Sequence, residues 1–388
     1  MREGDDPGRT GQLGRDQLAL RSGVDLMRID ALIASGVLQD KPDGYTVGDV
    51  RRVIILQGVL DAGLPLDAVA NGVKRGVLPI DFTDSDVFRR FAGLVDESFE
   101  AVSDRTGIPL DWLAVLREVT GWGHFEPDGR IREDELEVVP WLAAQARLGF
   151  RRPAVERFLR SMGDTLRRLA EAQAGWFRTE IQERYIAEGR VPEIARVDPE
   201  NRLSELGEQA LLALFRAQEA QTWIGNVVIG FEQTMATAGL HEPVVRHPSI
   251  CFLDITGYTR LTQERGDAAA AQLAETLGTL VNRRSGEHGG RPVKWLGDGV
   301  MFHFREAAGA VAAALQMVHG VLEAGLPPAH VGIHTGPVIV QSGDYYGQTV
   351  NLAARIAEYA RAGEVLVSEQ VRATSEDGDI RFVDIGVV

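Results

Sequence analysis

The amino-acid sequence predicts an α+β protein, in which an all-helical N-terminal domain precedes a C-terminal domain whose elements follow the order βαββαβ. Apolar residues recur at helical spacing from about residue 18 to 180 and again from 203 to 239. From His247 onward, short apolar runs alternate with amphipathic stretches. With 388 residues, of which 44% are hydrophobic and 25% charged, the chain is long enough to bury more than one core.

Composition and spacing divide the chain into four parts. Residues 1–19, rich in Gly, Asp and Arg, are expected to form a flexible tail, and residues 20–202 a helical domain. Residues 203–241 are expected to form a connecting helix, and residues 247–388 the second domain. Gly225 and Gly230 interrupt the connecting helix, each at a cost of about 1 kcal/mol relative to Ala. This helix is therefore either an element that switches in length or register, or a connector packed on a neighbour.

A faint repeat runs through the helical domain at an offset of 84 to 86 residues, and it pairs Ser22 with Thr106 and Asp49 with Asp134. A nearly constant offset predicts a duplicated helical unit. The first copy, LALRSGVDLMRIDALIASGVLQDKPDGYTVGDV, resembles the DNA-reading domain of MerR-type regulators in its helix-turn-helix spacing. The alternative is a helical fold reused for packing, which the acidic composition favours.

The charge balance limits the classes of partner. The net charge is −15, with 29 Lys and Arg against 39 Asp and Glu before residue 241, and 12 against 17 after it. Neither half offers the basic surface that nucleic-acid binding needs, so no nucleic-acid partner is expected. No apolar run approaches the length of a transmembrane segment or a signal peptide, which predicts a cytoplasmic protein. The single cysteine, Cys251, excludes an intrachain disulfide.

The second domain begins with a buried strand over 249–254, followed by an amphipathic helix over 264–283. A hairpin of strands 292–297 and 299–304 turns at Gly297-Asp298-Gly299. The remaining expected elements are a helix over 305–324, strands near 329–334 and 337–341, a helix over 349–360, and strands near 364–367 and 380–385. This order is the split βαβ, or ferredoxin-like, arrangement.

Two carboxylates are expected at one edge of this sheet. Asp254 closes the first strand and Asp298 lies on the hairpin turn, so both can reach the same divalent cations. Mg²⁺ flanked by phosphates needs only one or two protein carboxylates. The residues that follow form a small Gly-containing turn into a helix, which leaves N–H groups free to hold phosphates: Ile255, Thr256, Gly257, Tyr258 and Thr259.

Three segments make the function more specific. CFLDITGYTRLT, VKWLGDGVMFHF and GDYYGQTVNLAARI resemble, in order and in most spacings, the three signature segments of the class III nucleotide cyclases. The resemblance covers about 140 residues. It implies that Asp254 and Asp298, helped by the Ile255 carbonyl, bind two Mg²⁺ or Mn²⁺ ions per site. Two such ions activate the ribose 3′-hydroxyl and neutralise the triphosphate.

The resemblance also implies roles for four residues beyond the metal ligands. Lys294 and Asp344 match the pair that reads the purine, and adenine offers an acceptor at N1 for Lys and a donor at N6 for Asp. Guanine presents the reverse pattern on that edge, and mismatched buried polar groups are costly. Asn351 matches the residue that orients the ribose. Arg355 matches the one that stabilises charge on the α-phosphate, and the i, i+4 spacing places both on one helix face.

In the family, the metal aspartates come from one subunit and the purine pair, Asn and Arg from the other. One chain carries all six here, so the resemblance implies a head-to-tail homodimer with two sites that converts ATP to 3′,5′-cyclic AMP and pyrophosphate. Short-arm actinobacterial relatives suggest that the helical domain regulates the enzyme, with pH, a small molecule or a lipid as the stimulus. Rival hypotheses are a guanylate cyclase and a nucleotide-sensing transcription regulator with an inactive cyclase-like domain.

Two features depart from the family pattern. Only five residues separate Val338 from Asp344, where many relatives have a longer arm, and this makes Asp344 the least secure of the six matches. The sequence also ends at Val388, directly after the last expected strand, where relatives continue.

Overall fold

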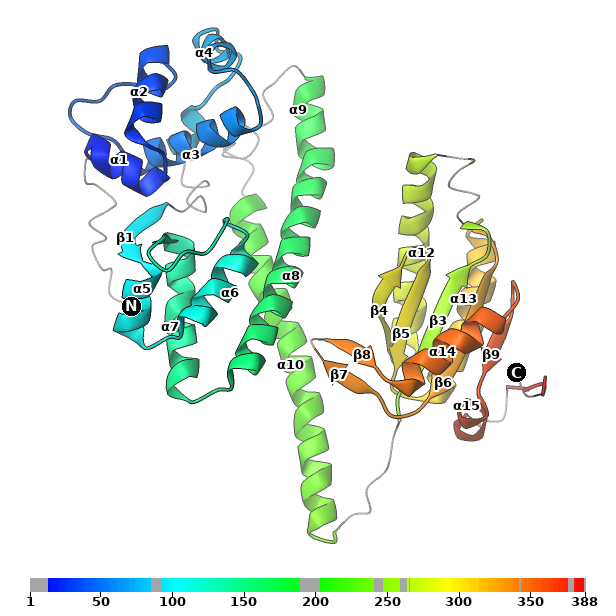
Figure 1. Ribbon diagram of the computed structural model, residues 1–388. Helices are drawn as coiled ribbons and strands as arrows, with labels where there is room; N and C mark the ends of the chain where they lie inside the picture. Colours follow the sequence, from blue (N-terminus) through cyan, green and yellow to red (C-terminus); the bar gives the residue numbers. More distant parts are fainter. Residues whose placement is uncertain are drawn as a thin grey trace. The chain divides into compact units, whose positions relative to one another are not determined.

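A computed structural model describes residues 13–84, 93–188, 203–240, 247–258, 264, 266–341, 343–375 and 380–386 of the chain. It divides into two compact units, residues 1–226 and 227–388. The helices of the first unit run from blue to green in Figure 1, and the strands of the second from yellow to red. None of the helices in the described part of the chain has the length and apolarity needed to cross a membrane.

The first unit begins with a bundle of four helices, α1 (Arg15–Ser22), α2 (Leu26–Ser35), α3 (Val47–Asp61) and α4 (Leu66–Lys74). Leu18, Ile29 and Leu32 lie at the centre of its core and are fully buried. Helix α1 therefore starts inside the stretch expected to be a flexible tail, because burial of Leu18 fixes this segment against the bundle. Residues 1–12 of that stretch lie outside the described residues.

A second bundle follows with a similar order of elements. Strand β1 (Leu94–Ser98) and helices α5 (Phe99–Thr106) and α6 (Leu110–Thr120) precede strand β2 (Arg130–Arg132), α7 (Glu133–Arg147) and α8 (Arg152–Phe177). A π-helical turn (Arg178–Gln182) and α9 (Glu183–Ala187) extend α8. Strands β1 and β2 pair antiparallel. In the first bundle, a single bridge between Leu13 and Tyr45 takes the corresponding place.

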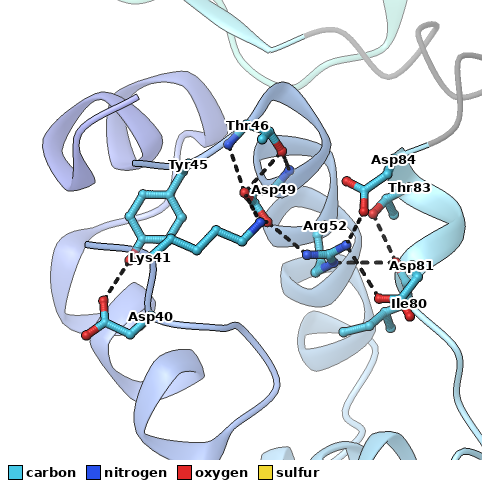
Figure 2. Close-up of polar contacts among 10 residues, drawn as sticks. All are labelled: Asp40, Lys41, Tyr45, Thr46, Asp49, Arg52, Ile80, Asp81, Thr83 and Asp84. Carbon is cyan, nitrogen blue, oxygen red and sulfur yellow. Dashed lines mark hydrogen bonds and ion pairs between the residues drawn. The ribbon is translucent and has the colours of Figure 1, made fainter. Parts of the chain in front are cut away.

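A buried carboxylate fixes the start of α3 in the first bundle (Figure 2). Asp49 is fully buried and accepts hydrogen bonds from the Thr46 backbone N–H, Lys41 Nζ and Arg52 Nη1, at 2.8 Å each. Arg52 continues the network to Asp84, 3.0 Å away. A buried charge is costly unless it is paired and hydrogen-bonded, so these cationic side chains are committed to the interior of the bundle.

The second bundle has the same device at the start of α7. Glu135 is fully buried and accepts from Arg117 Nη2 at 2.8 Å and from the Arg132 backbone N–H at 3.0 Å. Both Asp49 and Glu135 are the third residue of their helix and close a capping box. The structural counterpart of Asp49 is thus Glu135, and the pairing of Asp49 with Asp134 expected from the sequence is off by one residue.

The longest helix, α10 (Leu203–Thr237), contains the boundary between the two units. It runs without a break through Gly225 and Gly230, the two points at which the sequence indicates an interruption.

The second unit is built on a five-stranded sheet in the order β4-β5-β3-β6-β9, in which only β9 runs parallel to its neighbour. Its strands are β3 (Ser249–Ile255), β4 (Gly290–Leu296), β5 (Gly299–Phe304), β6 (Ala329–Thr335) and β9 (Val365–Val367). A separate hairpin joins β7 (Ile339–Gln341) to β8 (Asp344–Tyr346). The α+β architecture predicted from the sequence is confirmed.

Helices cover the two faces of the sheet (Figure 1). Helices α12 (Asp267–Glu287) and α13 (Ala307–Glu323) pack on the face that carries Cys251 and Phe302, where the main core lies. Helix α14 (Gln348–Tyr359) and the β7–β8 hairpin cover the opposite face, which carries Ile250 and Met301. This alternation follows from the two-residue period of a strand.

The end of the chain differs from the expectation. A short helix, α15 (Glu369–Thr374), follows β9, and residues 380–386 have no regular secondary structure where a strand over 380–385 was expected. Ile380 and Phe382 nevertheless pack against the main core, so the apolar alternation anchors this segment without strand pairing.

Candidate functional site

Asp254 and Asp298 meet at one end of the central strands. Asp254 is the sixth residue of β3, where it pairs with Gly299 of β5 and His330 of β6. Asp298 occupies the turn between β4 and β5, next to Gly297 at φ 68°. Burial, followed by the negative charge of Asp298, raises the pKa of Asp254 above its usual value. The two carboxylates therefore lie close enough to repel each other.

Gly299 leaves room for this pair. A Cβ atom at Gly299 would lie 3.1 Å from Asp254 Oδ1 and 3.2 Å from the Leu253 carbonyl oxygen. Any larger residue would press on the Asp254 carboxylate, so a glycine is required beside the hairpin turn for steric reasons.

His330, which the sequence analysis did not single out, lies beside Asp254. Its Nε2 lies 3.7 Å from Asp254 Oδ2, and its Nδ1 lies 3.3 Å from Thr256 Oγ1. The charge of His330 partly offsets the effect of Asp298 on the Asp254 pKa. The antiparallel pairing of β3 with β6 places the start of β6 beside the end of β3, and only that pairing could have pointed to His330.

The turn after β3 is less open than expected. Gly257 has φ 78°, which suits the expected tight turn. However, the Thr256 backbone N–H donates to the Pro328 carbonyl at 2.9 Å, so it is not free for a phosphate. The side chain of Ile255 is buried and that of Tyr258 packs against the main core. Thr259 lies outside the described residues.

Lys294 and Asp344 form an ion pair on the face covered by α14. Lys294 Nζ donates to Asp344 Oδ2 at 2.7 Å, and the Tyr345 backbone N–H donates to Asp344 Oδ1 at 2.8 Å. Burial raises the pKa of Asp344, but the bonds from Lys294 and Tyr345 outweigh it, and the pKa lies below its usual value. The short stretch after Val338 becomes the tight β7–β8 hairpin, which delivers Asp344 to Lys294.

Helix α14 displays Asn351 and Arg355 on its exposed side. Its opposite side packs closely on the sheet: Ala353 is fully buried, and a Cβ atom at Gly332 of β6 would lie 2.1 Å from the Ala357 backbone nitrogen. Within the described chain, Arg355 forms no ion pair. The structure thus brings together Asp254 with Asp298 and Lys294 with Asp344, and among the described residues no hydrogen bond or ion pair joins either pair to Asn351 or Arg355.

The donor set at Asp254 suits a metal shared with a substrate. Among the described residues, no group of three or more His, Cys, Asp or Glu side chains is arranged to hold an ion by itself. Mg²⁺ keeps several waters or substrate oxygens and needs only one or two carboxylates. The Asp254 carboxylate is 45% exposed and adjacent to a second carboxylate, which fits that requirement.

Comparisons with known proteins show what the second unit is similar to. Residues 243–388 match the family model described as the adenylate and guanylate cyclase catalytic domain. An adenylate cyclase of Streptomyces coelicolor is 33% identical over 54% of this chain and 52% of its own length. An uncharacterised protein of Mycobacterium tuberculosis is 26% identical over 90% of this chain and 87% of its own. The chain spans about half the length of the Streptomyces adenylate cyclases that it matches.

One solved structure is among the proteins to which this chain is similar. The adenylate/guanylate cyclase/hydrolase of Silicibacter pomeroyi is 26% identical, with 37% of this chain and 88% of that chain covered and a TM-score of 0.33. The match of residues 243–388 to the model described as the adenylate and guanylate cyclase catalytic domain confirms the resemblance of this part of the chain to the class III nucleotide cyclases.

Proposed function

We propose that this protein is an adenylate cyclase that converts ATP to 3′,5′-cyclic AMP and pyrophosphate. The observation that carries the proposal is the convergence of Asp254 and Asp298 at one end of the sheet, in a domain of the cyclase family. The similarity to a Streptomyces adenylate cyclase supports the same activity.

We assign the binding of metal ions and of phosphates to two neighbouring parts of the site. Asp254 and Asp298, with the Ile255 carbonyl, would hold two Mg²⁺ or Mn²⁺ ions. When bound, such ions would supply charge neutralisation for the triphosphate and activation of the 3′-hydroxyl. The turn from Thr256 to Thr259 lies against the phosphates through those of its N–H groups that are not already bonded.

Lys294 and Asp344 select the base. Lys294 donates to adenine N1, and Asp344 accepts from the N6 amino group. The ion pair between them supports this reading, because it holds one charged donor and one charged acceptor side by side.

The site is completed by a second copy of the chain. Lys294, Asp344, Asn351 and Arg355 of one chain act on the nucleotide whose metal ions the partner's Asp254 and Asp298 would hold. In that arrangement, Asn351 orients the ribose and Arg355 stabilises the negative charge that builds on the α-phosphate. Asn351 and Arg355 are both exposed on α14, and among the described residues neither is bonded to Asp254 or Asp298 of the same chain, which supports this arrangement.

Formation of cyclic AMP by the full chain against Asp254→Ala tests the proposal. We expect turnover of ATP by the wild type with Mn²⁺ or Mg²⁺, and a loss of at least about 1,000-fold in the variant. Equal rates in the two proteins would reject it. A guanylate cyclase is the second candidate, and faster turnover of GTP than of ATP by the wild type would establish it instead.

A transcription regulator is the third candidate, but the charge of the first bundle argues against DNA binding. Residues 13–84 contain eight Arg and Lys but ten Asp and Glu. Arg51 and Arg52 are buried, and Lys41 is bound to Asp49 (Figure 2). Few cations therefore remain for a phosphate backbone. A gel shift of random DNA by the full chain at 50 mM salt would revive this reading.

We also propose that residues 20–202 regulate the catalytic domain through the helix at 203–241. The full chain and a chain starting at residue 240 are to be compared from pH 5.5 to 8, with and without added lipid. A constant ratio of the two rates under all these conditions would remove the regulatory role.

A further inference from the structure

Helix α10 exposes apolar side chains along its whole length. Eleven large ones are more than 40% exposed: Leu206, Leu211, Leu212, Leu214, Phe215, Trp223, Ile224, Val228, Ile229, Phe231 and Met235. Only five of the 35 residues of the helix are charged, four Glu and one Arg. A helix about 52 Å long with this composition is not stable alone in water, because helices in proteins owe their stability mainly to the packing of an apolar face.

Part of this apolar surface follows the spacing of a coiled coil. Eight exposed residues alternate at intervals of four and three, and we name them the α10 stripe: Ala210, Leu214, Ala217, Gln221, Ile224, Val228, Phe231 and Met235. The line on the opposite side of the helix contains Leu212, Glu219, Asn226 and Gln233, and it is polar except for Leu212. Five of the eleven large exposed apolar residues lie on the α10 stripe, which is therefore a seam suited to a partner helix.

We propose that the α10 stripe is the surface along which two copies of this chain pair, as a parallel, in-register coiled coil. The inference rests on the proposed function, in which each site takes residues from two chains. A self-complementary apolar seam is what two identical helices require. Gln221, the one polar residue of the stripe, fixes the register, since only the in-register pair brings the two Gln side chains together.

The length of the connection to the catalytic domain decides the orientation. Residues 238–248 join α10 to β3, and eleven residues span at most about 40 Å when fully extended. In a parallel pair the two connections start about 10 Å apart. In an antiparallel pair they start about 50 Å apart, at opposite ends of the helices. In the parallel pair, the two catalytic domains can meet while both connections stay relaxed. In the antiparallel pair, both connections would have to extend along the coiled coil before the domains could meet.

The composition of α10 disfavours a lipid surface as the occupant. Four Glu and one Arg give the helix a net negative charge, and anionic lipid would repel it. When the helix pairs with its own copy along the α10 stripe, Glu208 and Glu219 lie on the outside of the pair and Glu232 lies at its flank.

Cysteine cross-linking in the full chain tests the pairing, and two neighbouring leucines provide a matched comparison. Leu214 lies on the α10 stripe and Leu212 on the opposite side, and both are exposed. The native Cys251 does not interfere, because it is fully buried and burial raises the pKa of its thiol. With copper phenanthroline as oxidant, we expect a covalent dimer from Leu214→Cys and from Val228→Cys, and at least about tenfold less from Leu212→Cys.

Two results would overturn the pairing. Equal cross-linking of Leu212→Cys and Leu214→Cys would mean random collision, and no cross-linking at either Leu214 or Val228 would mean that the stripe packs within one chain or in antiparallel order. If vesicles of anionic lipid bind the wild type and abolish the Leu214→Cys cross-link, then the α10 stripe binds a membrane and not a second copy of the chain.

Sedimentation separates a defect in pairing from a defect in folding or catalysis. Leu214→Glu places two carboxylates in one seam, so we expect the dissociation constant of the dimer to rise at least about tenfold, whereas Leu212→Glu leaves it unchanged. An unchanged dissociation constant in Leu214→Glu would contradict the proposal. Asp254→Ala should keep the cross-link of Leu214→Cys. If Asp254→Ala still converts ATP at the wild-type rate while the Leu214→Cys cross-link forms, the proposed function is wrong, but the proposed pairing along the α10 stripe is retained.

Discussion

Lys294 Nζ lies 2.7 Å from Asp344 Oδ2 and joins strand β4 to the β7–β8 hairpin. The two side chains are only 36% and 26% exposed, so each is largely committed to the other. A base that binds here has to replace one charge-assisted hydrogen bond by two, and it leaves a charge unpaired unless it offers an acceptor to Lys294 and a donor to Asp344.

Replacing Lys294 should therefore change the choice of base as well as the rate. We expect Lys294→Ala to lower kcat/KM for ATP by about 100-fold and to lower kcat/KM for GTP much less, because a hydrogen bond to a charged group is worth about 1.5–3 kcal/mol. Lys74→Ala, at an exposed lysine of the first unit, serves as the control. An ATP-to-GTP ratio that stays constant in Lys294→Ala would show that the pair does not read the purine.

The raised pKa of Asp254 predicts a metal requirement that depends on pH. A carboxylate whose pKa is raised by burial and by Asp298 is protonated at a higher pH than an ordinary aspartate, and the protonated form does not bind a cation. As pH is lowered, the Mn²⁺ concentration for half-maximal activity should thus begin to rise at a higher pH than an ordinary aspartate would give, and it should rise by up to about tenfold per unit below that pKa. Titration of bound Mn²⁺ by electron paramagnetic resonance checks the same affinity without turnover. An Mn²⁺ affinity that weakens only in the pH range of an ordinary aspartate, at about pH 4, would contradict the raised pKa.

The strand ends that carry Asp254 and Asp298 could be located from sequence because apolar alternation and the Gly297-Asp298-Gly299 turn are local signals. Asp344 is held by a hairpin too short to show alternation, so its place beside Lys294 depended on the resemblance. His330 depends on the partner strand of β3, and strand pairing is not a local property.

At residues 380–385 the sequence predicted a strand that the structure does not have. Their alternation is that of a strand, but Ile380 and Phe382 satisfy it by packing on the core without a partner strand. The same limit applies to the repeat, where the match of Asp49 to Asp134 needed a one-residue shift to Glu135 that only the helix starts reveal.

Mixing two inactive variants tests whether each site is shared between chains. Asp254→Ala and Arg355→Ala remove residues that the proposal assigns to different halves of a site. In a mixed dimer, one site then loses both residues and the other keeps both. Random association of equal amounts should restore about a quarter of the wild-type rate, since half of the dimers are mixed and each has one intact site. A mixture as inactive as its components would place both residues in sites made by one chain.

The close approach of α14 to the sheet predicts a large effect of one methyl group. A Cβ atom at Gly332 would lie 2.1 Å from the backbone nitrogen of Ala357, so Gly332→Ala must displace the helix that carries Asn351 and Arg355. We expect a loss of stability of about 1–3 kcal/mol and a lower kcat. Gly278→Ala in α12 is the matched control: its Cβ would meet Trp295 at 3.8 Å, and Ala there should stabilise by about 0.5–1 kcal/mol. Equal melting temperatures for the two variants would contradict this account of α14 packing.

His303 predicts how the stability of the catalytic domain depends on pH. The ring stacks on Tyr345 at 4.7 Å, and burial, followed by the charge of Arg291, lowers the pKa of His303 from 6.5 to about 4. Between pH 6.5 and 4 the unfolded chain binds a proton that the folded chain does not, so the free energy of unfolding falls as pH falls through this window.

The variant His303→Phe keeps the stack on Tyr345 but cannot bind the proton, and its free energy of unfolding should fall less steeply with decreasing pH than that of the wild type. The difference in slope should stay below the roughly 1.4 kcal/mol per pH unit that one proton contributes, because part of the ring reaches solvent. Urea unfolding followed by pulsed hydrogen exchange in the β5 peptide measures it between pH 7 and 5, with the exposed His247→Phe as control. If His303→Phe and the wild type lose stability in parallel, then another group binds the proton, and His303 is not the neutral side chain buried against Tyr345.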